Sequence, residues 1–297
     1  MSFKFYLKTD IGGYDLPADF PYLNASFLKS LEDLEFIDRV KAIFKFFTNT
    51  TLQNSDFSNI EDAEFPASIV NVDESLAVLE LFDGVNANYL DYIFSGENPL
   101  FEIISFACVI ISAYVDLFSS NLISYGEKFN LCFNASDGRL ALASWFCKLA
   151  KLPIETLILG ANKISSNNVK GIYLQSHMDG EVNFLIKGVF DDIDYLLDPI
   201  SAVGFVSYDL YYSDFEDGNF TVLLALASPY YFARQLLKTV AGINEISVDK
   251  AIQKINALTA LEIPDCIFSK KIQPFFKISP TIHLEEALDI IKKANLV

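Results

Sequence analysis

Histidine is the side chain that most directly suggests proton transfer, and this chain has only two, His177 and His283. His177 follows Ser176 and lies close to Asp179 along the sequence. A Ser–His–Asp group works only when all three side chains are within hydrogen-bond reach, and closeness in sequence does not supply that geometry. The pattern therefore favours a turn in which His177 is exposed.

Two groups of carboxylates could offer oxygen ligands to a divalent cation. They are Asp191, Asp192, Asp194 and Asp198, and, further along, Asp214, Glu216 and Asp217. The first group does not have the spacing of an EF-hand loop. For both groups the sequence favours a solvated acidic turn.

The cysteines do not form a metal-binding pattern. Each of the four lies in an apolar run, and none belongs to a C-x-x-C pair; they are Cys108, Cys132, Cys147 and Cys266. A structural zinc site needs closely spaced Cys and His ligands. We expect small buried hydrophobic residues in a reducing compartment, and no metal site.

The charge balance excludes several classes of partner. The formal net charge is −17 and the sequence pI is about 4.4. Such a chain is repelled by nucleic-acid phosphates and by anionic lipid surfaces. The longest uncharged apolar run, residues 103–115, lies between Glu102 and Asp116. It is shorter than the roughly 20 residues of a membrane span, so we expect a buried helix and a cytoplasmic protein.

The elements that must position these side chains have an α/β order. Buried strands are predicted at residues 76–82, 129–133, 154–161 and 220–227. Helices are predicted at about residues 100–118 and 140–152, after Asp198-Pro199, and at about 230–241, 247–258 and 283–295. Helical spacing also recurs from Leu28 to Ile37 and again from Val40 to Phe47, and residues 182–189 are strand-like. A strand, a helix and a strand over residues 129–161 predict a parallel pair joined by a helical crossover.

Four segments, in the right order, resemble threonine synthases, which are fold-type-II enzymes dependent on pyridoxal phosphate (PLP). They are residues 11–21 (IGGYDLPADFP), 76–92 (LAVLELFDGVNANYLDY), 133–163 and 195–229. The second is similar to the family's Leu-Glu-Leu-Phe-His-Gly-Pro-Thr-Leu-Ala-Phe-Lys-Asp-Phe. The third resembles the Gly-Asn-Phe-Gly loop, the helix after it and the strand that begins Leu-Pro-Ile. The fourth is similar to Leu-Asp-Pro-His-Thr-Ala-Val-Gly and to the strand end Thr-Ala-His-Pro.

The resemblance implies an α/β fold, the remnant of a fold-type-II large domain with a parallel or mixed sheet flanked by helices. Residues 1–95 would form an N-terminal cap-like segment. Residues 96–297 would form the large-domain remnant and a helical C-terminal region. The family's small substrate-binding domain, with its Ser-Gly-Asp-Thr-Gly loop, would be largely missing.

The departures from the family's motifs imply loss of PLP. The lysine that forms the Schiff base is replaced by Leu90, which has no amine. Leu226 stands where the family has a threonine beside the pyridine nitrogen. Residues 136–139 (SDGR) replace Gly-Asn-Phe-Gly, and the Asp137 carboxylate would repel a phosphate. We therefore expect a pseudoenzyme without catalytic residues or a cofactor, acting by protein or small-molecule binding.

Three alternatives remain open. The chain could be a functional threonine synthase, converting phosphohomoserine to threonine, or it could use the old cleft for another reaction. It could also be a sensor of phosphate or a phosphorylated metabolite, with a weak residual anion site at Ser136, Gly138 and Arg139. A homo-oligomer or another protein partner could cover the apolar surface left by the missing domain.

Overall fold

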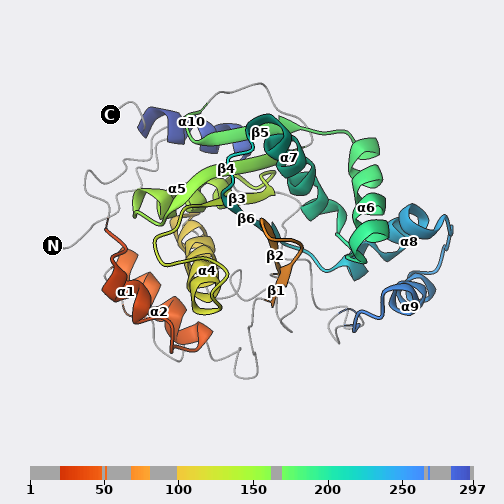
Figure 1. The fold of residues 1–297 in the computed structure, drawn as a ribbon, viewed down its shortest axis with the longest axis horizontal. Coiled ribbons are helices and arrows are strands. Elements are labelled where there is room, and N and C mark those ends of the chain that lie inside the picture. Colours follow the sequence, from red (N-terminus) through yellow and green to blue (C-terminus); the bar gives the residue numbers. More distant parts are fainter. Residues whose placement is uncertain are drawn as a thin grey trace.

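A six-stranded mixed sheet forms the centre of the fold (Figure 1). The computed structural model describes residues 21–48, 51, 68–80, 99–161, 169–263, 267 and 282–294. The strands are β1 (Ser68–Asn71), β2 (Leu76–Glu80), β3 (Phe129–Asn134), β4 (Ile154–Ala161), β5 (Ile172–Ser176) and β6 (Phe220–Ala225). Their order is β1-β2-β6-β3-β4-β5, and every neighbouring pair is parallel except β1 with β2.

Successive side chains of each strand point to opposite faces of the sheet, so the hydrophobic core has one part on each face. In β3, Phe129, Leu131 and Phe133 pack into one hydrophobic cluster, whereas Cys132 packs into the other. Residues of β6 alternate in the same way, with Val222 and Leu224 on the first face. Parallel strands buried on both faces require helices on both sides, so the molecule has three layers.

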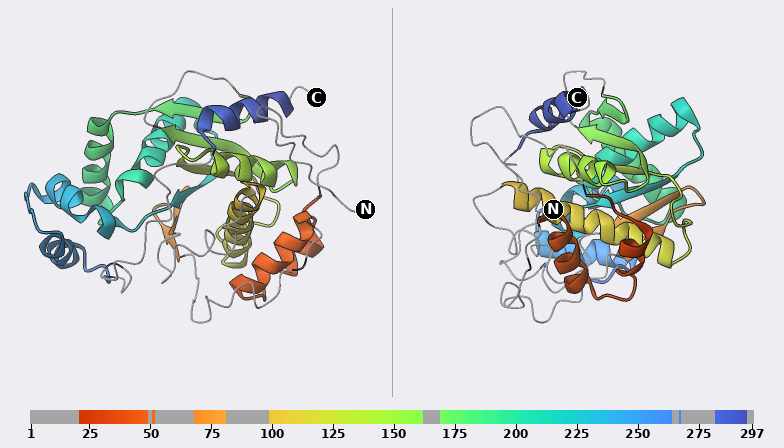
Figure 2. Two further views of the ribbon diagram at one scale, coloured as in Figure 1. Left: turned by 180° about the vertical axis from the view of Figure 1, so that it is seen from behind. Right: turned by 90° about the vertical axis from the view of Figure 1, so that its left-hand side faces the viewer.

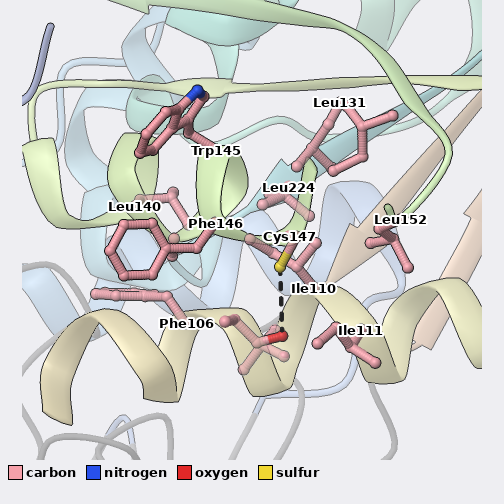
Figure 3. Packing of buried hydrophobic residues seen from close by; sticks show 14 of the residues in the cluster. Phe106, Ile110, Ile111, Leu131, Leu140, Trp145, Phe146, Cys147, Leu152 and Leu224 are labelled. Atoms are coloured by element: carbon pink, nitrogen blue, oxygen red, sulfur yellow. Dashed lines mark hydrogen bonds between the residues drawn. The ribbon is translucent and has the colours of Figure 1, made fainter. Parts of the chain in front are cut away.

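The first face is covered by helices from both ends of the chain. They are α1 (Ala25–Lys29), α2 (Phe36–Thr48), α4 (Pro99–Ser119), α5 (Gly138–Leu149) and α10 (Leu284–Ala294). Helix α5 packs against α4 and α10, and α2 packs on the outside of α4. Within this layer the Cys147 thiol of α5 points to the Ala107 carbonyl of α4, as Figure 3 shows. Because α4 is enclosed by other helices, its apolar run is a core helix.

The second face is covered by α6 (Asp179–Ile193), α7 (Pro199–Phe215), the 3-10 turn η2 (Pro229–Phe232), α8 (Ala233–Ala241) and α9 (Val248–Thr259). Helix α7 lies directly on β3 and β4. Helices α8 and α9 lie at the opposite end of the molecule from α1 and α2 in both long views (Figures 1 and 2). The α/β fold, with a mixed sheet flanked by helices, is confirmed.

The predicted elements are confirmed where a strong pattern stands between clear breaks. Strand β4 has the predicted bounds, and α7 begins at Pro199 with Asp198 as its N-cap. The strand-like interpretation of residues 182–189 is wrong, because they lie within α6. The helix buries Val182, Ile186 and Val189, which are spaced at about one helical turn.

Three further features differ from the expectation. Leu31 and Leu34, expected in one helix with Leu28 and Ile37, lie between α1 and α2, since residues 30–33 form turns. Arg39 stabilises this break by donating from Nε to the carbonyls of Leu31 and Leu34, both at 2.9 Å. Strands β1 and β5 are short and were not predicted.

Strands from both predicted segments, 1–95 and 96–297, join the one sheet, since β2 pairs with β6. The sequence also predicts a strand at residues 1–10, and this segment and residues 81–98 lie outside the described residues. In the part of the chain that the structure describes, no helix combines the length and the apolarity needed to cross a membrane.

Candidate functional site

The carboxyl ends of parallel strands are the usual ligand end of an open α/β sheet, because helices begin there and loops converge. Here β3 leads into α5 and β6 ends beside the start of α7. We call the buried polar residues at this place the strand-end cluster. They are Asn134, Asp137, Arg139, Asp198, Ser201 and Ser228.

The backbone N–H groups at the start of α5 are already engaged. Gly138 N donates to the Ile282 carbonyl at 3.0 Å, and Arg139 N donates to Asp137 Oδ1 at 3.0 Å. Leu140 N donates to the Asp137 carbonyl at 3.2 Å. Ser136 uses both its N–H and its hydroxyl on Asn134 Oδ1, at 2.9 and 2.7 Å. A helix N-terminus attracts an anion through such donors, and in this helix the chain itself supplies their acceptors.

Asp137 and Arg139 form a buried ion pair across the first turn of α5. Arg139 Nε donates to Asp137 Oδ1 at 2.8 Å, and a second guanidinium nitrogen donates to Oδ2. Arg139 is 1% exposed and Asp137 is 3% exposed. The guanidinium also lies over the Phe106 ring, 5.6 Å from its centroid. The carboxylate therefore occupies the electropositive position at the helix start where an external anion would bind.

The chain that precedes α10 covers the same helix start. A Cβ placed on Gly138 would be 2.5 Å from the His283 carbonyl oxygen and 2.9 Å from that of Ile282. Glycine is required here because two backbone segments meet. The three residues of the expected anion site, Ser136, Gly138 and Arg139, are thus brought together, with their donors turned to internal acceptors.

The start of α7 is closed in a similar way. Asp198 Oδ1 accepts from Ile200 N at 2.8 Å and Ser201 N at 3.1 Å, and the Ser201 hydroxyl donates to Oδ2. Leu226 N, just after β6, donates to Ser201 Oγ at 3.3 Å. Burial raises the pKa of the Asp198 carboxyl to about 6, although these hydrogen bonds oppose the rise. Asp198 was expected in a solvated acidic turn, and that expectation is wrong because it caps a buried helix start.

His177 is buried, not exposed as the sequence suggested. Its Nε2 lies 2.6 Å from Ser207 Oγ of α7, and its Nδ1 lies 3.9 Å from a Glu181 carboxylate oxygen. Ser207 is 0% exposed and its hydroxyl also points to the Leu159 and Val203 carbonyls. The arrangement contains a Ser, a His and a carboxylate, but a substrate cannot reach a serine enclosed between α7 and β4. Burial lowers the pKa of His177, partly offset by Glu181.

The remaining predicted residues divide between core and surface. Asp191, Asp192 and Asp194 are exposed, and so are Asp214, Glu216 and Asp217. Cys108, Cys132 and Cys147 are free and buried, and burial raises the pKa of each thiol. Cys266 lies outside the described residues. Over the described ranges, no group of three or more His, Cys, Asp or Glu side chains could hold a metal ion.

Sequence comparison gives no relatives. No family model matches the chain, and no curated protein matches it. Solved structures do match. The threonine synthase from Escherichia coli has a TM-score of 0.62 at 12% identity, over 94% of this chain and 92% of that chain. The chain has a threonine-synthase-like fold.

Two further threonine synthases support the same fold. The Brucella melitensis enzyme, solved with PLP bound, gives a TM-score of 0.59 at 13% identity, over 94% of this chain and 92% of that one. The yeast enzyme gives 0.63 at 12% identity, over 94% and 91%. The resemblance drawn from four short motifs thus predicted the correct fold.

This fold gives the expected site residues a structural context. Leu226 is the first residue after β6, and its N–H contacts the strand-end cluster by donating to Ser201 Oγ. Leu90 lies outside the described residues. Among the described residues that directly follow strands β3, β5 and β6 (135–137, 177–178 and 226–228), none is a lysine.

Proposed function

We propose that this protein keeps a threonine-synthase-like fold without PLP-dependent catalysis and acts by binding. The observation that carries the proposal is the closed N-terminus of α5, where Asp137 and the Ile282 carbonyl take the donors that a cofactor phosphate would need. One of the similar structures was solved with PLP bound. The described residues at this place do not fit that group.

The physical argument is a competition between two anions for one site. A phosphate at the start of α5 would have to displace the Asp137 carboxylate from Arg139, which is almost fully buried. Leaving one member of a buried ion pair without its partner costs about 3–5 kcal/mol. The same competition weakens the phosphate-sensor alternative at Ser136, Gly138 and Arg139.

The sequence supports the proposal at a second point. Leu90, in the segment that resembles the family's lysine motif, cannot form a Schiff base, and no lysine occurs between Lys45 and Lys128. Leu226 offers only an apolar side chain where a hydroxyl would face the pyridine nitrogen. These departures concern different chemical requirements, so a single compensating change would not restore all of them.

The decisive experiment combines spectroscopy with an activity assay. Purified protein is mixed with PLP, scanned for the visible band of an aldimine, reduced with borohydride and mapped by peptide mass spectrometry. A parallel sample is supplied with phosphohomoserine and analysed for threonine. We expect no stoichiometric band, no label at a single lysine near the carboxyl ends of the strands and no threonine. Threonine formation would overturn the proposal and establish the alternative of a functional threonine synthase.

A binding role also covers the expectation of a protein partner or a homo-oligomer. Among the described apolar side chains, Phe184 is 83% exposed and Ile246 is 85% exposed. Phe184 lines a groove of about 560 Å³ with residues of α6 and α8. We propose that a second copy of this chain covers this groove. Sedimentation velocity should detect a dimer that Phe184→Ser weakens, whereas a monomer at all concentrations would contradict this part.

A further inference from the structure

A cavity of about 430 Å³ lies at the opposite end of the sheet, where β4 and β5 begin. Its walls come from three places in the chain: the last turn of α5, the connection into β4, and the residues that lead into β5. The size is within the range of small-ligand pockets, which is about 300–1,000 Å³. Neither Leu226 nor any residue of the strand-end cluster contributes to it.

The cavity concentrates positive charge in an acidic protein. Lys148, Lys151 and Lys170 line it, and its described lining includes no Asp or Glu. The whole chain has 22 basic residues against 39 acidic ones, so three lysines without a carboxylate are a local reversal of the overall charge. Lys151 and Lys170 are exposed, and the described residues place no carboxylate within ion-pair distance of either.

Lys148 is fixed at the inner side of the cavity. Its ammonium donates to the Glu155 carbonyl, and Gly171 leaves the space that it occupies, since a Cβ there would be 2.9 Å from Lys148 Nζ. The Glu155 carboxylate is paired with Lys128 at 2.7 Å. Burial lowers the pKa of Lys148, Glu155 opposes that change and Lys128 reinforces it. An anion in the cavity would favour the charged form of this side chain.

The rest of the wall is apolar. Trp145, Leu149, Leu152 and Ile172 contribute to it. Trp145 lies on the side of α5 away from α4, and so away from Phe106 and Ile111 (Figure 3). A cation cluster beside an apolar wall suits a ligand that carries both a negative group and an apolar body.

We propose that this cavity binds a small phosphate monoester, with the phosphate held by Lys148, Lys151 and Lys170 and the organic group against Trp145 and its apolar neighbours. Lysine binds phosphate as a point charge. Three ammonium groups match the double negative charge of a phosphate monoester better than the single charge of a carboxylate ligand. This site gives a ligand class to the binding role proposed above and rests on that role. Its test needs neither PLP nor threonine formation, so the two proposals can fail separately.

Trp145 is the only tryptophan in the chain, so all tryptophan fluorescence comes from a side chain that lines this cavity. The experiment titrates phenyl phosphate, inorganic phosphate and neutral benzyl alcohol at constant ionic strength while recording tryptophan fluorescence. We expect a saturable change with phenyl phosphate, weaker binding of inorganic phosphate and no response to benzyl alcohol. Inorganic phosphate binding as tightly as the ester would contradict the role of the apolar wall.

The variant Lys151→Gln/Lys170→Gln should bind phenyl phosphate at least about tenfold more weakly, because two charged contacts are lost. The matched control is Lys29→Gln/Lys250→Gln, which removes the same charge at exposed positions on α1 and α9. Its affinity should equal that of the unmodified protein. No saturable change up to about 10 mM ester, or equal losses in both variants, would overturn the proposal.

Discussion

Charged side chains are buried at one end of the parallel sheet and exposed at the other. At the carboxyl ends, Asp137, Arg139 and Asp198 are buried, and each carboxylate accepts hydrogen bonds at the start of its own helix. At the amino ends, Lys151 and Lys170 stand exposed around a cavity. Open α/β sheets ordinarily bind ligands at the carboxyl ends. In this protein the charges at that end serve the fold, whereas the charges at the other end remain accessible to a ligand.

The comparison is tested most strongly by removing the Asp137 carboxylate. Asp137→Ala removes the carboxylate that pairs with the buried Arg139 and caps the start of α5, so the free energy of unfolding should fall by about 3–5 kcal/mol. Urea denaturation measures the change. The double variant Asp137→Ala/Arg139→Met removes both charges and keeps the apolar volume, and it should recover most of the loss. A loss below about 1 kcal/mol for Asp137→Ala would show that this end does not depend on the pair.

The second prediction concerns the pH dependence that Asp198 produces. Burial raises its pKa from 3.8 in the unfolded chain to about 6 in the folded protein. The folded state therefore keeps this proton to higher pH, and Asp198 lowers stability as the pH rises from about 4 to 6. The shift corresponds to about 3 kcal/mol, since one pKa unit is 1.36 kcal/mol.

Asp198→Asn keeps an oxygen that can accept from Ile200 N and Ser201 N, but it does not titrate. The stability of this variant relative to the unmodified protein should therefore increase between pH 4 and 6 and then level off. Asp192→Asn, in the exposed part of the same acidic stretch, is the control. If the free energy of unfolding of Asp198→Asn and of the unmodified protein changed in parallel with pH, the raised pKa of Asp198 would be contradicted.

A smaller effect of opposite sign is expected from His177. Because burial lowers its pKa, the unfolded chain binds a proton that the folded protein takes up only at lower pH. Stability from this group is present above about pH 6.5 and is lost as the pH falls. In His177→Gln the free energy of unfolding should fall less as the pH is lowered. Near neutral pH it should be about 1 kcal/mol lower than in the unmodified protein, because the hydrogen bond to Ser207 is lost. A pH profile of His177→Gln that runs parallel to that of the unmodified protein would contradict this effect of the buried imidazole.

The smallest effect is expected at the amino ends of the strands. Lys151→Gln/Lys170→Gln should change the free energy of unfolding by less than about 0.5 kcal/mol, because both side chains are exposed and pair with no carboxylate of the described residues. Denaturation of this variant beside Asp137→Ala compares the two regions directly. A loss approaching that of Asp137→Ala would mean that the lysines support the fold.

The sequence predicted the elements whose pattern is local. Strand β4 lies between Pro153 and a polar stretch, and α7 has an Asp-Pro start, so both were found. Helix α6 was missed because β-branched residues concealed the helical spacing of Val182, Ile186 and Val189. The likeness of four motifs identified the fold where no sequence relative does.

The site was less predictable because its contacts join distant segments. Gly138 meets Ile282, and His177 meets Ser207. Neither pairing leaves a signal in the local sequence, so His177 was expected on the surface. The cavity at Lys148 and Lys170 was missed for the same reason, since these two lysines come together only after β4 and β5 have paired.

The position of β6 has a consequence for how the chain reaches this fold. Of the described strands, β6 is the last to be synthesised, yet it lies in the middle of the sheet, between β2 and β3. During translation β2 and β3 therefore each expose an unpaired edge until residues 220–225 have left the ribosome. Such long-range pairing slows folding and leaves strand edges open to aggregation. We expect the nascent chain to depend on chaperones until β6 inserts and joins the two halves.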